Sequence, residues 1–398
     1  MRRETIMGPS YPPRPMAVNQ TMRILGFMTG TSLDAVDMAV LETDGEEVQA
    51  FGPAGERKLR EATRDLLLKA TDIARAWPRG APEPAIFAEA RRAVADEHLH
   101  AAESFIAEHG LAWGDFDLLG VHGQTVLHER PTAERVGRTV QLLDAERLAK
   151  ACGRPVAFDF RTADVAAGGE GAPLAPVYHA ARARASGLLA PVAALNLGGV
   201  ANVTFVRPPS TGLGGDLLAF DTGPANGMID LVVQARGAGR FDAGGALARA
   251  GTVDQAVLAA LLARPYFATR PPKSLDRFDF PIESVDGLSL EDAAATLTAF
   301  TVASVARAYD WLPVEERPKQ LIVAGGGRHN GYMMQGLSQA LAGVSEVVSA
   351  DDLGWRGDAI EAEAFAFLAA RTARGLPISF PGTTGVASPM TGGRIVRP

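Results

Sequence analysis

Two short glycine-rich turns carry backbone and hydroxyl groups that are suited to contact a phosphate. Gly30 is followed by Thr31 and Ser32, and Gly198 is followed by Gly199. Glycine lets a backbone N–H group approach an anion closely because it has no Cβ, and a neighbouring hydroxyl adds another donor. Neither turn matches the GxxxxGK[ST] phosphate loop or the GxGxxG dinucleotide loop, which disfavours those nucleotide-binding folds. Each turn alone is also compatible with an ordinary hairpin, so the turns become informative only as a set.

A third glycine-rich segment, KQLIVAGGGRHNGYMM, begins as an apolar strand and continues as a helix-like stretch. Gly325, Gly326 and Gly327 lie between the two parts. A nucleotide held between two lobes needs a phosphate-contacting hairpin from each lobe and an edge against which adenine can lie. The three glycines would provide that edge; the alternative is that they only allow a strand and a helix to pack closely.

Acidic side chains in two segments are candidates for proton transfer. Asp221 follows an apolar run in LLAFDTGPANGMID, which predicts a carboxylate at a strand end, where ligands commonly bind in α/β sheets. Such a carboxylate can accept a proton from water or a hydroxyl group; the alternative is a turn aspartate that bonds its own backbone. Asp159 and Asp164 flank Arg161 in a second cluster, which is equally compatible with a structural ion pair or turn.

A histidine-containing segment, GVHGQTVLH, adds a third group of polar residues. His122 follows a short apolar run and precedes glycine, glutamine and threonine, which favours ligand binding at another strand end. His122, His128 and His179 lack the cysteines and the close spacing of a structural zinc site. We therefore expect any metal to be Mg²⁺ that arrives with a nucleotide and needs few protein carboxylates.

Short strand-like runs alternate with helical stretches from Met22 onward, which predicts an α/β architecture. A strand is expected over residues 36–41, after the first glycine turn. One helix is expected to begin at Asp358, with Glu361 completing a capping box, and to end before Gly375. Another should begin at Ser289 with the same capping pattern.

Length and composition limit the remaining possibilities. A chain of 398 residues is longer than one core usually supports, so we expect two lobes: residues 22–162 with 378–398, and residues 163–377. The net charge of −7 argues against a nucleic-acid or membrane surface and favours a small-molecule ligand. The single cysteine, Cys152, predicts a buried thiol in a reducing compartment. Residues 1–21 read as a loose tail without the apolar core of a secretory signal, and we expect a cytoplasmic location.

Eight segments, in order, resemble the anhydro-N-acetylmuramic acid kinase family between about Gly26 and Gly385. They are GFMTGTSLDAVD, GVHGQTVLH, DFRTADVAAGGEGAPLAPVYH, LNLGGVANVTF, FDTGPANGMID, VAGGGRHN, GDAIEAEAFAFLA and PGTTG. The resemblance implies an α/β, two-lobed actin/hexokinase-like (ribonuclease H-like) fold with a central cleft for nucleotide and sugar. It also implies an ATP-dependent kinase that opens a 1,6-anhydro sugar and phosphorylates O6 during cell-wall recycling.

The resemblance further implies roles for individual residues. Asp221 would be the general base that activates water. ATP, with Mg²⁺, would be bound by Gly30, Thr31, Ser32, Leu33, Asp34, Gly198, Gly199, Asn202, Gly325, Gly326 and Gly327. The sugar would be bound by His122, Asp159, Arg161 and Glu361. The residues that would contact the metal, and whether the chain forms a homodimer, are left open.

Four positions depart from the family pattern. Glu170 stands where the family usually has Gln, Thr29 where Ser is common, Ala35 where Gly is common and Ser379 where Asn is usual. Glu170 adds a charge near the expected sugar pocket, which leaves the fine substrate preference open. Two other functions are also left open: a kinase of another small sugar or anhydro-sugar, and a nucleotide-dependent assembly protein of the actin kind.

Overall fold

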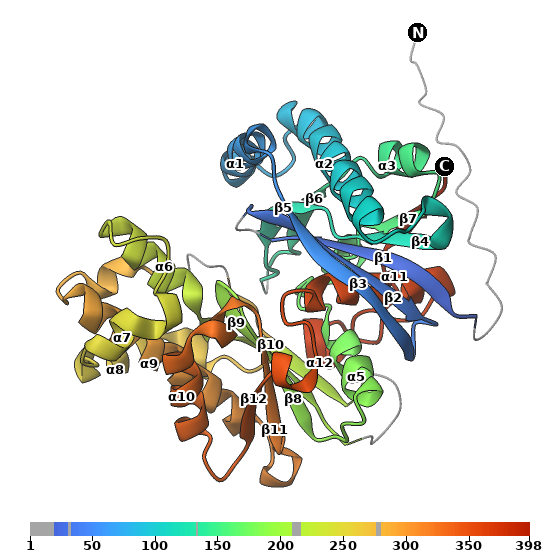
Figure 1. The fold of residues 1–398 in the computed structure, drawn as a ribbon. Helices are drawn as coiled ribbons and strands as arrows, with labels where there is room; N and C mark the ends of the chain where they lie inside the picture. Colours follow the sequence, from blue (N-terminus) through green and yellow to red (C-terminus); the bar gives the residue numbers. More distant parts are fainter. Residues whose placement is uncertain (1–19, 31–32, 133, 209–215, 276–279) are drawn as a thin grey trace.

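The computed structural model describes residues 20–30, 33–132, 134–208, 216–275 and 280–398, and within them the strands form two large sheets and one hairpin (Figure 1). The first sheet has the order β13-β7-β4-β1-β2-β3. Its strands are β1 (Met22–Thr29), β2 (Ala35–Thr43), β3 (Val48–Lys58), β4 (Leu118–Val121), β7 (Val156–Phe158) and β13 (Arg394–Val396). The predicted tail falls almost entirely outside the described residues, as do Thr31 and Ser32.

The second sheet has the order β10-β9-β8-β11-β12. Its strands are β8 (Val192–Leu197), β9 (Val200–Val206), β10 (Leu217–Pro224), β11 (Gln320–Ala324) and β12 (Glu346–Ser349). Strands β8 and β9 pair antiparallel, and β8 and β11 pair parallel. Strands β5 (Gln124–Glu129) and β6 (Arg138–Leu142) form the separate hairpin. The predicted strand–turn–strand units at Gly30 and Gly198 are therefore confirmed, since each joins two antiparallel neighbours.

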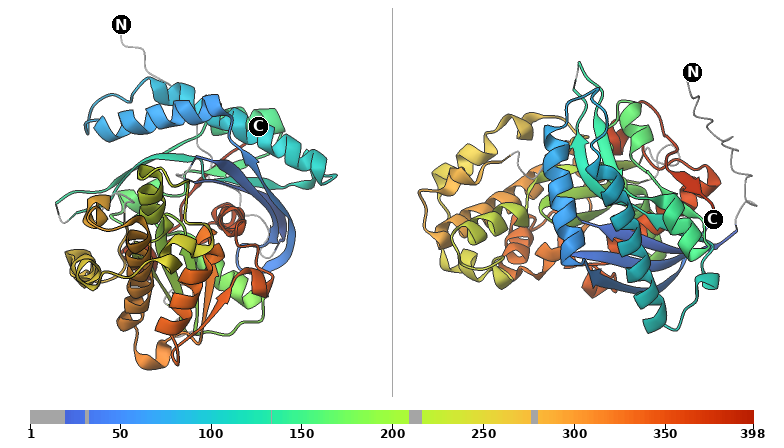
Figure 2. Two further views of the ribbon diagram at one scale, coloured as in Figure 1. Left: turned by 60° about the vertical axis from the view of Figure 1, so that its left-hand side comes forward. Right: turned by 90° about the horizontal axis from the view of Figure 1, so that it is seen from above.

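Helices α5 (Pro176–Ala185) and α11 (Ile360–Arg374) lie between the two sheets, as two views of the ribbon show (Figures 1 and 2). One hydrophobic cluster joins α5 and α11 to both sheets, including Ile24, Tyr178, Ile322 and Phe367. A second cluster lies between the first sheet and helices α1 (Glu61–Ala76), α2 (Ile86–Glu108) and α3 (Ala145–Cys152). The buried Cys152 belongs to it, as predicted.

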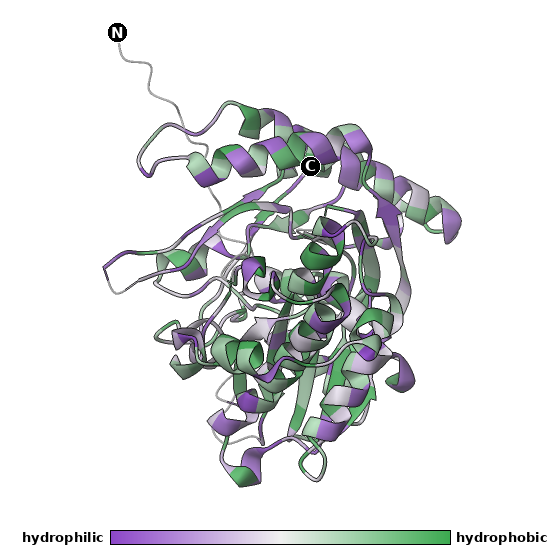
Figure 3. Ribbon diagram, turned by 90° about the vertical axis from the view of Figure 1, so that its left-hand side faces the viewer, coloured by the Kyte–Doolittle hydropathy of each residue, from purple (hydrophilic) through white to green (hydrophobic). Residues whose placement is uncertain are grey.

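The outer face of the second sheet is covered by further helices. They are α6 (Asn226–Ala235), α7 (Ala246–Ala250), α8 (Gln255–Leu262), α9 (Leu290–Ala308) and α10 (Gly331–Ala340). Two short helices, α4 (Thr162–Ala166) and α12 (Pro381–Thr384), lie in connections. The outer helices carry both hydrophilic and hydrophobic residues along their length (Figure 3), which is expected of helices that pack on one side only.

One of the two predicted helix starts is wrong. Helix α9 begins as expected, because the Ser289 side chain accepts a hydrogen bond from the Asp292 amide. Helix α11 has Ala359 at its N-cap and no side-chain cap, so Asp358 and Glu361 do not form a capping box. The Asp358 carboxylate instead accepts two hydrogen bonds from the Arg328 guanidinium, of 2.6 and 2.7 Å. Two charge-assisted bonds outweigh one backbone cap.

The division into two lobes stays a prediction. Each sheet draws its strands from a different part of the chain, residues 22–158 with 394–396 and residues 192–349. Helix α11 falls in the predicted second lobe by sequence but packs on β1, β2 and β4 of the first sheet. Within the described residues, no helix combines the length and the apolar character needed to cross a bilayer.

Candidate active site

The β8–β9 turn is built from glycines that leave open space beside the backbone. A Cβ added at Gly198 or Gly199 would have no neighbour closer than 3.6 Å. The start of α6 holds the turn in place: the Asn226 amide donates to the Gly198 carbonyl at 3.0 Å, and its side chain donates to the Leu197 carbonyl at 2.9 Å. Because the turn's carbonyls face α6, its N–H groups are suited to an anionic ligand.

The glycines after β11 pack against the end of β8. Gly325 has a φ of 75°, and a Cβ there would come within 2.3 Å of the Asn196 Oδ1 atom. A Cβ at Gly327 would come within 2.5 Å of the Leu197 Cβ atom, whereas Gly326 has no neighbour within 4 Å. The expected strand–turn–helix unit is confirmed, with a short 3₁₀ turn, Gly326–His329, before α10. The glycines bring this turn directly beside the β8–β9 turn.

The first glycine turn lies next to the histidine-containing segment. The side-chain amide of Gln124 donates to the Gly30 carbonyl at 3.4 Å, and the backbone amide of Leu33 donates to the same carbonyl at 3.3 Å. Leu33 is buried with a φ of 55°, and the exposed Asp34 bonds the Ala35 amide. The Gln124 Oε1 atom is buried without a hydrogen-bond partner, which leaves an acceptor for a ligand.

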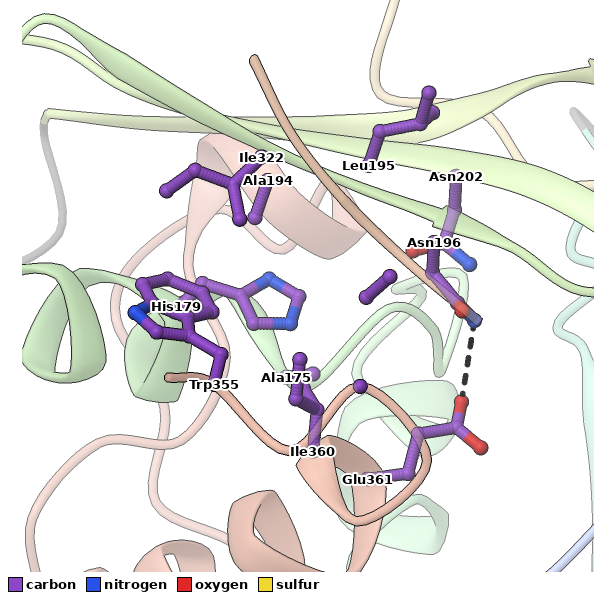
Figure 4. Close-up of a pocket in the computed structure, with 12 residues that line it drawn as sticks. Ala175, His179, Ala194, Leu195, Asn196, Asn202, Ile322, Trp355, Ile360 and Glu361 are labelled. Carbon is purple, nitrogen blue, oxygen red and sulfur yellow. Dashed lines mark hydrogen bonds between the residues drawn. The ribbon is translucent and has the colours of Figure 1, made fainter. Parts of the chain in front are cut away.

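A pocket beneath the second sheet brings together two of the predicted site residues (Figure 4). Asn196 and Asn202, from β8 and β9, lie across it from Glu361 at the start of α11. Asn196 Nδ2 donates to Glu361 Oε1 at 3.5 Å. Burial raises the pKa of Glu361, and the nearby Arg161 opposes that rise. The predicted cofactor residue Asn202 and the predicted sugar residue Glu361 therefore line one space.

Arg161 lies at the electrostatic centre of the site. Its Nε atom donates to His122 Nε2 at 2.9 Å, and its Nη1 atom donates to the Gly171 carbonyl at 2.8 Å. Burial lowers the pKa of Arg161, while the charges of Glu361, Asp164 and Asp221 oppose that shift. Burial and the Arg161 charge also hold the pKa of His122 well below its usual range. His122 is therefore a neutral acceptor directly after β4.

Asp221 lies within β10, and not at its end as predicted, because the strand continues to Pro224 across a register shift. Its Oδ2 atom accepts a 2.7 Å hydrogen bond from the Leu275 amide. Burial raises the pKa of Asp221 to about 7, although the Leu275 hydrogen bond lowers it. The Glu170 charge adds to the rise, and the charges of Arg130 and Arg161 oppose it. A carboxyl group with such a pKa is half ionised near neutral pH, as a general base requires.

Asp159 and Asp164 form their hydrogen bonds and ion pairs with residues other than Asp221. Asp159 Oδ1 accepts from the Thr162 hydroxyl, and Oδ2 pairs with Arg394 at 3.2 Å. Asp164 is buried, and its two oxygens accept from the Gly171 amide and the Thr384 hydroxyl, at 2.7 and 2.6 Å. Asp164 thus shapes the loop that carries Glu170. Whether Asp159 contacts a ligand stays a prediction.

Comparisons with known proteins identify the family of this chain. The profile described as anhydro-N-acetylmuramic acid kinase matches residues 22–398. The chain belongs to the anhydro-N-acetylmuramic acid kinase family. Curated members from Caulobacter vibrioides and Phenylobacterium zucineum are 76% and 66% identical to it, over 94% and 95% of this chain and 99% and 100% of theirs. A solved ROK family glucokinase from Streptomyces griseus, in complex with glucose and AMPPNP, aligns over 88% of this chain and 99% of its own at 12% identity and a TM-score of 0.39.

The two mixed sheets and the helices packed on them confirm the α/β class predicted from the sequence. The two-lobed actin/hexokinase-like architecture stays a prediction. Two residues at the site were missed at the level of sequence: Asn196 and Asp37. Burial raises the pKa of Asp37 to about 7, and the Glu361 charge adds to the rise. Asp37 lies in the motif GFMTGTSLDAVD, but only the fold shows that it faces Glu361.

Over the described ranges, no group of three or more His, Cys, Asp or Glu side chains could hold a metal ion.

Proposed function

We propose that this chain is an ATP-dependent kinase that opens the 1,6-anhydro ring of anhydro-N-acetylmuramic acid with water and phosphorylates O6. The product would be N-acetylmuramic acid 6-phosphate, in cell-wall (peptidoglycan) recycling. Family membership over residues 22–398 supports the substrate, since the curated relatives bear that name. The observation that carries the mechanism is Asp221: a carboxylate with a pKa of about 7, fixed by one backbone bond and facing Arg161.

The substrate dictates the order of bonds. In a 1,6-anhydro sugar O6 is already bonded to C1, so it can accept a phosphoryl group only as the C1–O6 bond breaks. Water forms the new bond to C1, its proton passes to the Asp221 carboxylate, and O6 takes the γ-phosphoryl group as the bond to ADP breaks. A hexokinase-like reaction would use the same carboxylate to deprotonate a free hydroxyl group instead.

The glycine turns fit a nucleotide. We assign the triphosphate to the turns at Gly30 and Gly198, and the adenosine to the edge at Gly325, because the space beside Gly198 and Gly199 admits a ligand close to the backbone. Mg²⁺ bound to the phosphates would supply positive charge for the transferring phosphoryl group. On the sugar side, His122, Arg161 and Glu361 would orient the substrate.

Isotope labelling tests the reaction directly. With ATP and anhydro-N-acetylmuramic acid in ¹⁸O-water, we expect one ¹⁸O atom on C1 of the product and none in its phosphate. Label in the phosphate, or a product without label at C1, would show that water does not open the ring as proposed.

The two other functions are separated by simple assays. A kinase of another sugar would turn over levoglucosan or glucose faster than anhydro-N-acetylmuramic acid. An actin-like assembly protein would sediment in the presence of ATP without any sugar; the same sedimentation run reports whether the chain is a homodimer. We further propose a cytoplasmic location and no nucleic-acid partner, in line with the net charge of −7.

Replacing Glu361 by Gln should weaken sugar binding without lowering stability. Glu361 caps no helix, and a Gln side chain can still accept the Asn196 hydrogen bond, so only the charge is removed. Loss of one charge-assisted hydrogen bond should raise the sugar Kd about tenfold, as measured by calorimetry. The matched control is Glu103→Gln on the exposed side of α2, which should leave the Kd unchanged. Unchanged affinity in Glu361→Gln would remove it from the sugar site.

Closure of two lobes around both ligands is the expected motion. The turns at Gly30 and Gly198 belong to different sheets, so we expect them to complete their contacts with one triphosphate when the sheets approach each other. Closure would also keep bulk water from hydrolysing ATP. Small-angle scattering with an ATP analogue and sugar together should show a smaller radius of gyration than the free protein. An unchanged radius in a sample that binds both ligands would indicate a preformed pocket instead.

A further inference from the structure

A three-residue segment, Lys273–Ser274–Leu275, forms hydrogen bonds with both the backbone and the side chain of Asp221. We call this segment the strap. The Asp221 amide donates to the Lys273 carbonyl at 3.0 Å, and the Leu275 amide donates to Asp221 Oδ2 at 2.7 Å. The carboxylate therefore takes its orientation from the strap.

The strap is anchored firmly on the Asp221 side. Lys273 is buried, its ammonium group donates to the Tyr266 carbonyl at 2.8 Å, and it lies 4.3 Å from the centre of the Tyr266 ring. The Tyr266 hydroxyl in turn donates to the Asp221 carbonyl. Lys273 is thereby directed at Tyr266, and its backbone, not its charge, contacts Asp221.

The other side of the strap is held by two charged residues from distant parts of the chain. Arg130, directly after β5, donates to the Ser274 carbonyl at 2.5 Å. The Ser274 hydroxyl donates to Glu170 Oε2, also at 2.5 Å. Ser274 itself is buried, so both bonds are shielded from water.

The loop that presents Glu170 is part of the sugar side of the site. The Glu170 amide donates to the Thr384 carbonyl at 2.7 Å, and the next residue, Gly171, is bonded by both Asp164 and Arg161. Arg161 also bonds His122. A path of hydrogen bonds, joined by the peptide links Gly171–Glu170 and Ser274–Leu275, thus runs from the sugar-side residues to the carboxylate of Asp221.

We propose that Glu170 and Arg130 are positioning residues for the general base: through the strap they fix the Asp221 carboxylate, and through their opposite charges they set its proton affinity. This proposal rests on the proposed function in assigning Asp221 as the base. Among the described residues, the charged groups that face Asp221 are Glu170, Arg130 and Arg161. Because Arg161 is bonded to His122 and Gly171, we expect it to keep its position when either of the other two is changed.

Two substitutions should change the titration of Asp221 in opposite directions. Glu170→Gln keeps an acceptor for the Ser274 hydroxyl but removes a negative charge, so the pKa of Asp221 should fall by roughly half a unit or more. Arg130→Met removes a positive charge and one strap bond, so the pKa should rise. A purely structural role would give no such opposition, because Glu170→Gln keeps its bond to Ser274 and would leave the pKa of Asp221 unchanged, whereas only Arg130→Met loses a strap bond.

The experiment is an NMR titration of the full chain labelled with ¹³C at the aspartate carboxyl carbon. The Asp221 signal is identified by its absence from Asp221→Asn, and its pKa is measured in the parent protein and in both variants. Shifts of opposite sign support the proposal; no shift, or shifts of the same sign, overturn it. Ser274→Ala, which cuts only the Glu170 link, should lower kcat more than it raises the KM for ATP, and a wild-type kcat would also overturn it.

The titration needs no turnover, so it separates this proposal from the proposed function. If the parent protein phosphorylates no anhydro-sugar but the two shifts oppose each other, the strap still couples these charges to Asp221 and only the reaction is wrongly assigned. In the other case, turnover occurs and the fall of kcat/KM at low pH follows the NMR pKa of Asp221 in the parent protein, Glu170→Gln and Arg130→Met. That result supports both proposals.

Discussion

Replacing Asp221 by Asn is expected to lower kcat by about 10²–10⁴-fold, the usual effect of losing a general base. The amide keeps the shape of the side chain, and its oxygen can still accept the Leu275 hydrogen bond, so ATP and sugar binding should be retained. Turnover measured by coupled ADP release, together with calorimetric Kd values for both ligands, tests the two halves of this expectation separately.

The pH dependence of the parent protein belongs to the same test. A general base works in its deprotonated form, so kcat/KM should rise with pH up to about 7, the pKa of Asp221, and level off above it. Below that value the rate should fall about tenfold per pH unit. ATP titrates in a similar range, but its contribution is common to every variant and cancels in the comparison with Glu170→Gln.

A matched control is offered by Asp230 on α6. Burial raises its pKa to about 6, as burial raises that of Asp221, but the charge that adds to the rise is that of Asp242, which has no assigned role in the site. Asp230→Asn should therefore keep the parent turnover. Near-normal turnover in a folded Asp221→Asn would transfer the role to another carboxylate, with Asp159 and Asp164 the next candidates.

Features that depend on neighbours in sequence could be predicted from sequence. The antiparallel pairs β1–β2 and β8–β9 need only two apolar runs and a glycine turn between them, and both are present. The cap of α9 needs only Ser289 and the amide three residues on. In each case the partners lie within one turn or hairpin, so no distant group competes for them.

Features that depend on partners distant in sequence could not be predicted from sequence. Asp358 has the spacing of a helix cap, but Arg328, far earlier in the chain, takes its carboxylate. Asn196 becomes a site residue only because folding brings it to Glu361, 165 positions away. The raised pKa of Asp221 likewise depends on burial and on charges from two other segments, one with Arg130 and one with Arg161 and Glu170. The candidate base could thus be named from its motif, whereas the groups that control it required the fold.

The close packing of α11 on the first sheet gives a prediction about stability. A Cβ at Gly26 would lie 2.0 Å from the Ala362 carbonyl oxygen and 2.8 Å from the Ala366 nitrogen, which are backbone atoms that no rotamer change can move. Gly26→Ala should therefore lower the free energy of unfolding by about 3 kcal/mol or more, at the upper end of overpacking effects. The measurement is the urea midpoint at unchanged slope.

The same substitution links packing to the site, because Glu361 precedes Ala362 in the first turn of α11. If α11 moves away from β1 to accept the methyl group, Glu361 moves with it, and the sugar Kd should rise in the fraction that remains folded. Gly287→Ala is the matched control: a Cβ there has no neighbour within 4 Å, so neither the midpoint nor the Kd should change. Equal midpoints for the two variants would mean that α11 does not pack on Gly26 as closely as described. A lower urea midpoint for Gly26→Ala with the sugar Kd of the parent protein would mean instead that β1 moves to accept the methyl group. The start of α11 and the Glu361 carboxylate would then stay in place.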